Sequence, residues 1–126
     1  MRNVVLIVDD MKFNRQILKD ILEDEYQIAE AENGKVALDV IEAKHEEIAA
    51  VLLDIVMPEM DGVHTLKQIR AIPEMKDMKI IFYTSEPKED IENALKKVYP
   101  DELGQLHYLI KPSSPETISI AIQSVL

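Results

Sequence analysis

Apolar residues concentrate in five short runs along the chain, separated by longer stretches with a different periodicity. The runs cover residues 3–8, 26–31, 48–53, 79–83 and 107–110. Short β-branched runs bounded by turn residues predict strands, and a run that is apolar throughout predicts a strand buried on both faces. The run at 26–31 alternates only weakly, which favours a strand at the edge of the sheet.

Between these runs, apolar residues recur three and four positions apart, which predicts helices with an inward apolar stripe. The stripes are Phe13, Ile17, Leu18, Ile21 and Leu22; Val36, Ala37, Val40 and Ile41; Val63, Leu66 and Ile69; Ile91, Ala94, Leu95 and Val98; and Ile118, Ala121, Ile122 and Val125. Asp10 is a candidate N-cap for the first helix, and Pro73 ends the third. Ile120 lies off the stripe of the last helix.

The alternation of strands and helices predicts an α/β fold, a single doubly wound (βα)5 domain over residues 1–126. Helices then cover both faces of a five-stranded parallel sheet. Because the crossovers are right-handed, the C-terminal ends of all five strands meet at one edge of that sheet. Ligands of open α/β sheets bind at this edge.

The composition of the chain excludes some classes of function and disfavours others. The chain has 126 residues, 47% of them apolar, which is enough for one domain with a core. The absence of cysteine excludes disulfides, thiolate metal sites and a cysteine nucleophile. The net charge of −10 disfavours direct binding of nucleic acid by this chain. No apolar segment is long enough for a signal peptide or a membrane span, so we expect a cytoplasmic protein without membrane contact.

Four of the five predicted strands end in polar residues suited to chemistry. These are Asp9 and Asp10, then Asp54, then Thr84 and Ser85, and finally Lys111. Three carboxylates in one cleft repel each other, and a hard cation with oxygen ligands, such as Mg²⁺, relieves that repulsion. With Lys111 and the hydroxyl of Thr84 nearby, the cleft suits a phosphoryl group, and Asp54 would be the nucleophile that forms an acyl phosphate.

Four motifs occur in order around these residues: Val8-Asp9-Asp10, residues 53–62 (LDIVMPEMDG), Tyr83-Thr84-Ser85 and residues 108–112 (YLIKP). Together they resemble the receiver domains of two-component response regulators, including the chemotaxis receivers. The resemblance covers the whole chain. It implies a flavodoxin-like fold with the strand order 2-1-3-4-5.

The resemblance also implies the metal site and the phosphoacceptor. Asp54 would accept a phosphoryl group from the phosphohistidine of a sensor histidine kinase or a phosphotransfer protein. Asp10, Asp54 and the backbone carbonyl of Val56 would bind the cofactor Mg²⁺, and Asp9 would act through a metal-bound water. The product is a modified form of the protein itself, so we do not expect an enzyme in the usual sense, although slow self-dephosphorylation is implied.

Further roles follow from the resemblance for residues near the phosphoryl group. Thr84 and Lys111 would hold its oxygens and act as catalytic residues with Asp54. Pro112 would follow a cis peptide bond that aims Lys111. Tyr108 matches an aromatic switch position, which would turn inward as Thr84 moves toward the phosphate.

Two features bear on the output. Receivers signal through the face formed by the fourth helix, fifth strand and fifth helix, toward an output domain, a target protein or a second copy in a homodimer. The interval between Thr84 and Lys111 is a few residues longer than usual, around Val98–Leu103, and we expect Tyr99–Leu103 to form an extra turn beside the fifth strand. The last helix has no stop signal, which favours a receiver excised from a longer protein with a C-terminal output domain.

Two other functions are open at this stage. A phosphate-independent pseudo-receiver would act only as an interaction module, although all acceptor, metal and lysine positions are filled here. A phosphohydrolase of the haloacid dehalogenase type would also use an aspartyl nucleophile, but it carries a second aspartate two residues later. That position is Val56, which cannot transfer a proton.

Overall fold

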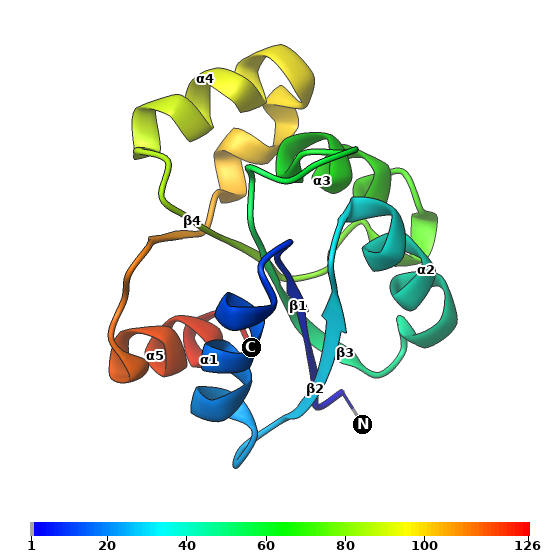
Figure 1. Ribbon diagram of the computed structural model, residues 1–126. Coiled ribbons are helices and arrows are strands. Elements are labelled where there is room, and N and C mark those ends of the chain that lie inside the picture. Colours follow the sequence, from blue (N-terminus) through cyan, green and yellow to red (C-terminus); the bar gives the residue numbers. More distant parts are fainter. Residues whose placement is uncertain (1) are drawn as a thin grey trace.

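The computed structural model describes residues 2–126, and its centre is one sheet of five parallel strands (Figure 1). The strands are β1 (Val4–Val8), β2 (Gln27–Ala31), β3 (Ile48–Leu53), β4 (Ile80–Thr84) and β5 (Tyr108–Ile110). Their order is β2-β1-β3-β4-β5, which confirms the predicted fold class and topology. All residues of β1 and β3 are buried, as their continuous apolar runs predict.

Five α-helices and two 3₁₀ helices connect the strands. They are α1 (Lys12–Leu22), α2 (Gly34–Lys44), α3 (Gly62–Arg70), η1 (Pro73–Met75), α4 (Lys88–Val98), η2 (Pro100–Gln105) and α5 (Pro115–Val125). The helices α1 and α5 cover one face of the sheet, and α2, α3 and α4 cover the other (Figure 1). The strands therefore separate two apolar cores.

Two expectations for α1 were wrong. The N-cap is Met11, and Asp10 does not cap the helix; instead, the carboxylate of Asp9 accepts a hydrogen bond of 2.9 Å from the backbone N–H of Met11. Phe13 is 72% exposed, and Ile17 is also exposed. The buried residues of the stripe are therefore Leu18 and Leu22. Phe13 and Ile17 face solvent rather than the sheet.

The extra residues before β5 form the helix η2, which confirms the predicted extra turn. It packs mainly against α4 and α3, whereas we expected it beside β5. Glu102 of η2 is buried, and its carboxylate accepts two hydrogen bonds of 2.9 Å from the guanidinium of Arg70, on α3. This pair fixes the connection between α4 and β5 to the rest of the domain.

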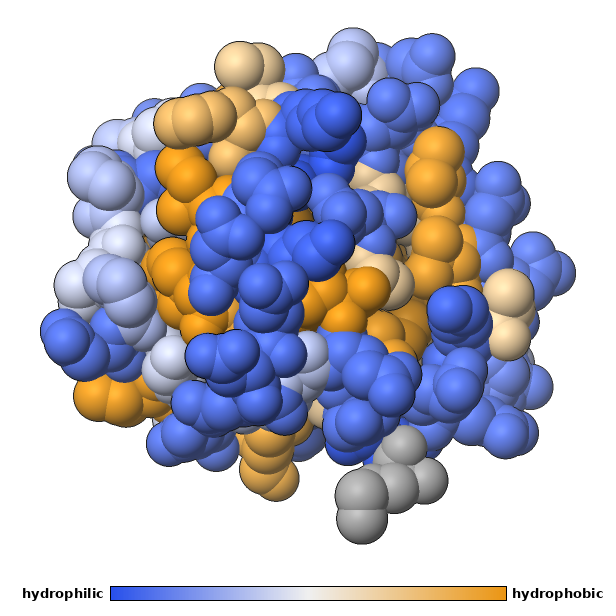
Figure 2. Space-filling view, turned by 60° about the horizontal axis from the view of Figure 1, so that its bottom comes forward, coloured by the Kyte–Doolittle hydropathy of each residue, from blue (hydrophilic) through white to orange (hydrophobic). Residues whose placement is uncertain are grey.

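The surface is acidic and mostly polar. Hydrophilic side chains cover most of the face shown in Figure 2, and hydrophobic side chains appear there in separate patches. Ile120 is one of the exposed apolar residues, as its position off the helical stripe predicts. Among residues 2–126, no helix combines the length and hydrophobicity needed to cross a membrane.

Candidate functional site

The strand ends bring three aspartates together at the C-terminal edge of the sheet. Asp9 and Asp10 follow β1, and Asp54 follows β3, which is the neighbour of β1. One carboxylate oxygen from each lies within 4.8 Å of the others. Asp9 and Asp54 are buried, and Asp10 is exposed. The cluster that the sequence predicts is therefore present, with its third carboxylate open to solvent.

Lys111 reaches this cluster from the end of β5. Its ammonium donates a hydrogen bond of 2.6 Å to Asp9 Oδ2 and one of 3.1 Å to Asp54 Oδ2. Burial alone would lower the pKa of Lys111, but the hydrogen bonds and charges of the two carboxylates outweigh it and raise the pKa above its ordinary value. The lysine thus stays positively charged and neutralises part of the cluster.

The carboxylate of Asp54 is held at both oxygens. Oδ1 accepts a hydrogen bond of 2.7 Å from the backbone N–H of Ile55, and Oδ2 faces Lys111. The following loop closes tightly, since the N–H of Gly62 donates to the carbonyl of Ile55 over 2.8 Å. Val56 lies in this loop with its side chain exposed. The strand end and the closed loop therefore orient Asp54 toward the cluster.

Asp61 has a structural role in the same loop. Its carboxylate accepts a hydrogen bond of 2.9 Å from the backbone N–H of His64 and so caps α3. Its side chain also contacts the imidazole of His64. Within residues 2–126, the three aspartates at the strand ends are the only group of potential ligands with metal-like spacing, and no histidine belongs to it.

Thr84 and Tyr108 occupy the predicted switch positions on β4 and β5. Thr84 is fully buried, and its hydroxyl accepts a hydrogen bond of 3.3 Å from the backbone N–H of Glu86. The hydroxyl keeps its own proton for another acceptor. Tyr108 is half-buried and packs against the core under α4, with the ammonium of Lys88 lying 5.6 Å from its ring centre. The two side chains make separate contacts in this structure.

The segment after β5 has a partner that sequence reasoning missed. The peptide bond between Lys111 and Pro112 is cis, as the resemblance implies. The backbone N–H of Ser113 donates a hydrogen bond of 3.2 Å to the hydroxyl of Tyr83, and the ammonium of Lys111 lies 5.6 Å from the centre of the Tyr83 ring. A signal was available, because Tyr83 is a polar aromatic residue at the end of an otherwise apolar strand, directly before Thr84.

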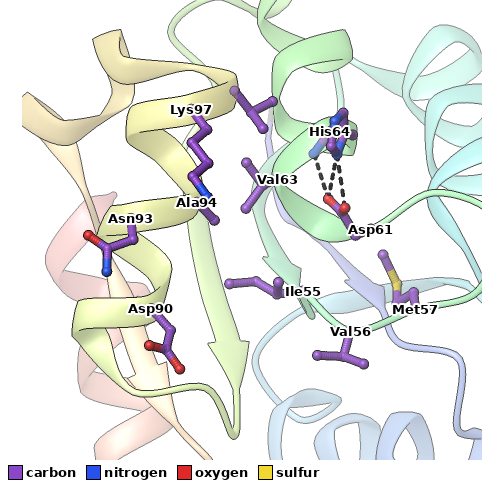
Figure 3. A pocket seen from close by; sticks show the side chains of 11 residues that line it. Ile55, Val56, Met57, Asp61, Val63, His64, Asp90, Asn93, Ala94 and Lys97 are labelled. Carbon is purple, nitrogen blue, oxygen red and sulfur yellow. Dashed lines mark hydrogen bonds and ion pairs between the residues drawn. The ribbon is translucent and has the colours of Figure 1, made fainter.

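A hollow of about 550 Å³ lies beside the cluster, between α3 and α4. In Figure 3, Ile55 and Val63 point across it toward α4, which contributes Ala94 and Lys97 to the opposite wall. The three clustered aspartates and Lys111 do not line it. The two helices are therefore incompletely packed next to the loop that follows Asp54.

Carboxylates and a lysine at the C-terminal edge of a parallel sheet with the order β2-β1-β3-β4-β5 are typical of receiver-type signalling domains. The sequence matches the response regulator receiver domain over residues 5–123, and the chain belongs to this family. Receiver domains act as signalling switches of two-component systems.

The chain is similar to a transcriptional regulatory protein and to two regulators of solved structure. The transcriptional regulatory protein SrrA of Staphylococcus aureus is 35% identical over the whole chain, which spans about half of SrrA (48%). The chemotaxis protein CheY4 of Vibrio cholerae is 29% identical, with a TM-score of 0.86 and full coverage of both chains. The response regulator TrrA of Thermotoga maritima, solved in complex with Mg²⁺ and a beryllium fluoride, is 28% identical with a TM-score of 0.79, again with full coverage of both chains.

The donor set of the cluster fits Mg²⁺. Hard divalent cations prefer carboxylate and carbonyl oxygens, and Asp9, Asp10 and Asp54 offer three carboxylates close enough for one ion. The ammonium of Lys111 already lies against two of these carboxylates. Lysine and a divalent cation therefore compete for the same negative charge.

We expect the substitution Lys111→Met to strengthen Mg²⁺ binding by roughly tenfold, because it removes a positive charge next to the ion's ligands. Isothermal titration calorimetry with MgCl₂ would measure the change. Lys88→Met, which removes a lysine that contacts Tyr108 rather than the cluster, is the matched control and should leave the affinity unchanged. Equal affinities for wild type and Lys111→Met would contradict the competition.

Proposed function

We propose that the protein is a phosphoacceptor switch of a two-component pathway, with residues 1–126 acting as one receiver domain. The phosphoryl donor would be a phosphohistidine on a sensor histidine kinase or a phosphotransfer protein. The observation that carries the proposal is the contact of the Lys111 ammonium with both Asp9 and Asp54 at the edge of the sheet. This contact would keep a cation beside Asp54, which would gain negative charge when it is phosphorylated.

The chemistry is a single displacement at phosphorus. The bond between phosphorus and the donor's imidazole nitrogen breaks as a bond forms between phosphorus and a carboxylate oxygen of Asp54. The electron pair of the broken bond stays on the imidazole nitrogen, which then takes up a proton. Asp54 is held for this role by the backbone N–H of Ile55.

The other residues of the site stabilise the transferred group. Lys111 would turn from the carboxylate of Asp54 to the phosphoryl oxygens, and Thr84 would donate its hydroxyl proton to another of them. Asp10, Asp54 and the backbone carbonyl of Val56 would hold Mg²⁺, with Asp9 acting through a metal-bound water, and the ion would neutralise further charge on the phosphoryl oxygens. Slow self-dephosphorylation would return the protein to its resting state.

The conformational change would be transmitted from Thr84 to the face formed by α4, β5 and α5. A shift of Thr84 toward the phosphoryl group leaves space that the ring of Tyr108 can enter. The hollow between α3 and α4 leaves α4 room to adjust. Ile110 and Ile120 are exposed apolar residues on this face, suited to an output domain, a target protein or a second copy of the chain.

Labelling with radioactive acetyl phosphate and Mg²⁺ tests the function. We expect a label that decays only slowly on the wild type and no label on Asp54→Asn, because only the carboxylate can attack phosphorus. Asp61→Asn is the matched control: it changes an aspartate in the same loop that lies outside the cluster, and asparagine can still cap α3. This control should label normally.

The alternatives give different results in the same assay. A protein that takes no label under any condition would be a phosphate-independent pseudo-receiver. Repeated turnover of a phosphomonoester, with release of inorganic phosphate, would instead indicate a phosphohydrolase. Either result would overturn the proposed switch.

A further inference from the structure

Tyr83 contacts both Lys111 and the backbone segment that follows it. It is the residue before Thr84 on β4, so its side chain points to the opposite face of the sheet, toward α1 and α5. Its ring lies 5.6 Å from the ammonium of Lys111, within the range of a cation–π interaction. Its hydroxyl accepts a hydrogen bond from the backbone N–H of Ser113, two residues further along. One side chain therefore holds both the ammonium and the backbone of this segment.

Apart from Tyr83, little packs against the side chain of Lys111 on the face of the sheet that α1 covers. A small hollow of about 150 Å³ borders Lys111, Pro112 and Tyr83, and Asn14 and Ile17 of α1 form its other wall. The lysine side chain is therefore not packed all round, and four rotatable bonds separate its ammonium from the backbone. A flexible cation loses conformational entropy each time it must be placed against a charged partner. The ring of Tyr83 limits that freedom.

We propose that Tyr83 is a positioning residue for phosphoryl transfer, because it keeps the ammonium of Lys111 within reach of Asp54. This inference rests on the proposed function. When a phosphoryl group arrives, the ammonium exchanges a carboxylate of the cluster for a phosphoryl oxygen. The ring and the hydrogen bond to Ser113 hold the lysine at the edge of the sheet during that exchange, so its charge is in place when the bond to phosphorus forms.

The first test measures phosphorylation by acetyl phosphate at saturating Mg²⁺. We expect Tyr83→Leu to slow the rate at saturating donor by about tenfold and to leave the half-saturating donor concentration nearly unchanged, since the lysine acts in the transfer step. Tyr83→Phe keeps the ring and loses the hydroxyl, and it should retain about a third of the rate or more. A Tyr83→Leu protein as fast as the wild type would overturn the proposal.

A double-mutant cycle separates positioning from general structural damage. If Tyr83 acts through the lysine, Tyr83→Leu should change the residual rate of a Lys111→Ala protein by less than about twofold. An equal loss in both backgrounds would mean that Tyr83 does not act through Lys111. Both proteins can be checked for folding by circular dichroism before the rates are compared.

A third measurement does not require phosphorylation. In proton–carbon NMR spectra, the ε-methylene protons of Lys111, assigned by their absence in Lys111→Ala, should be shielded by the ring current of Tyr83. The shielding should persist in Tyr83→Phe and disappear in Tyr83→Leu. An unshielded Lys111 in the wild type would overturn this inference alone, whereas the absence of label on a shielded wild type would overturn the proposed function.

Discussion

Replacing Arg70 with methionine is expected to lower the free energy of unfolding by about 3–5 kcal/mol. Arg70 and Glu102 are both buried, and the guanidinium donates two hydrogen bonds of 2.9 Å to the carboxylate. Without the arginine, the charge of Glu102 would stay in the interior without a partner. The cost of that uncompensated charge dominates the effect.

Arg70 also holds the connection from α3 to β4. Its Nη1 donates hydrogen bonds to the backbone carbonyls of Met75, at 3.3 Å, and Met78, at 2.6 Å. Unpaired buried carbonyls add to the loss of stability. The arginine therefore joins three segments: the end of α3, the connection around η1, and η2 through Glu102.

Urea unfolding followed by circular dichroism would measure the change. The double variant Arg70→Met/Glu102→Leu removes both charges and should recover most of the lost stability, because an apolar pair can replace a buried ion pair. Lys67→Met, at an exposed site on the same helix, should stay within about 0.5 kcal/mol of the wild type. A loss of less than about 1 kcal/mol for Arg70→Met would contradict this account.

This ion pair shows where sequence reasoning stops. Arg70 and Glu102 lie 32 residues apart, and each is an ordinary charged residue by its local pattern. The pairing depends on how η2 turns back toward α3, and no periodicity records that turn. Tyr83 is a partial case: its polar aromatic side chain stands out in the strand, but its contacts depend on the path of the backbone after Lys111.

The acidic cluster could be predicted because it depends on topology alone. Once the strands are parallel, their C-terminal ends meet, and Asp9 and Asp54 must lie near each other. The direct contact of Lys111 with both carboxylates could not be predicted, since the sequence places Lys111 near the cluster but does not show which carboxylates its ammonium meets. Asp10 was a candidate N-cap for α1, but Met11 occupies that position. The local pattern does not distinguish a capping aspartate from one that faces the cluster.

The glycine that closes the loop after Asp54 is expected to be the other position with a large effect. A methyl group on Gly62 would overlap the carbonyl oxygen of Asp54 and come within 2.8 Å of the Cα atom of Ile55. Both are backbone atoms, so the clash can be relieved only by moving the loop. We expect Gly62→Ala to cost about 2–3 kcal/mol of stability.

The same displacement should weaken Mg²⁺ binding, because Asp54 and the carbonyl of Val56, two of the ligands proposed above, belong to the segment that must move. We expect a loss of about tenfold in affinity, in line with other disturbances of groups that orient metal ligands. Urea unfolding and calorimetry with MgCl₂ measure the two effects separately. Gly104→Ala is the matched control, since a methyl group there meets no atom within 4 Å. If the two alanine variants have the same stability and affinity, the close approach of Gly62 to Asp54 does not shape the site.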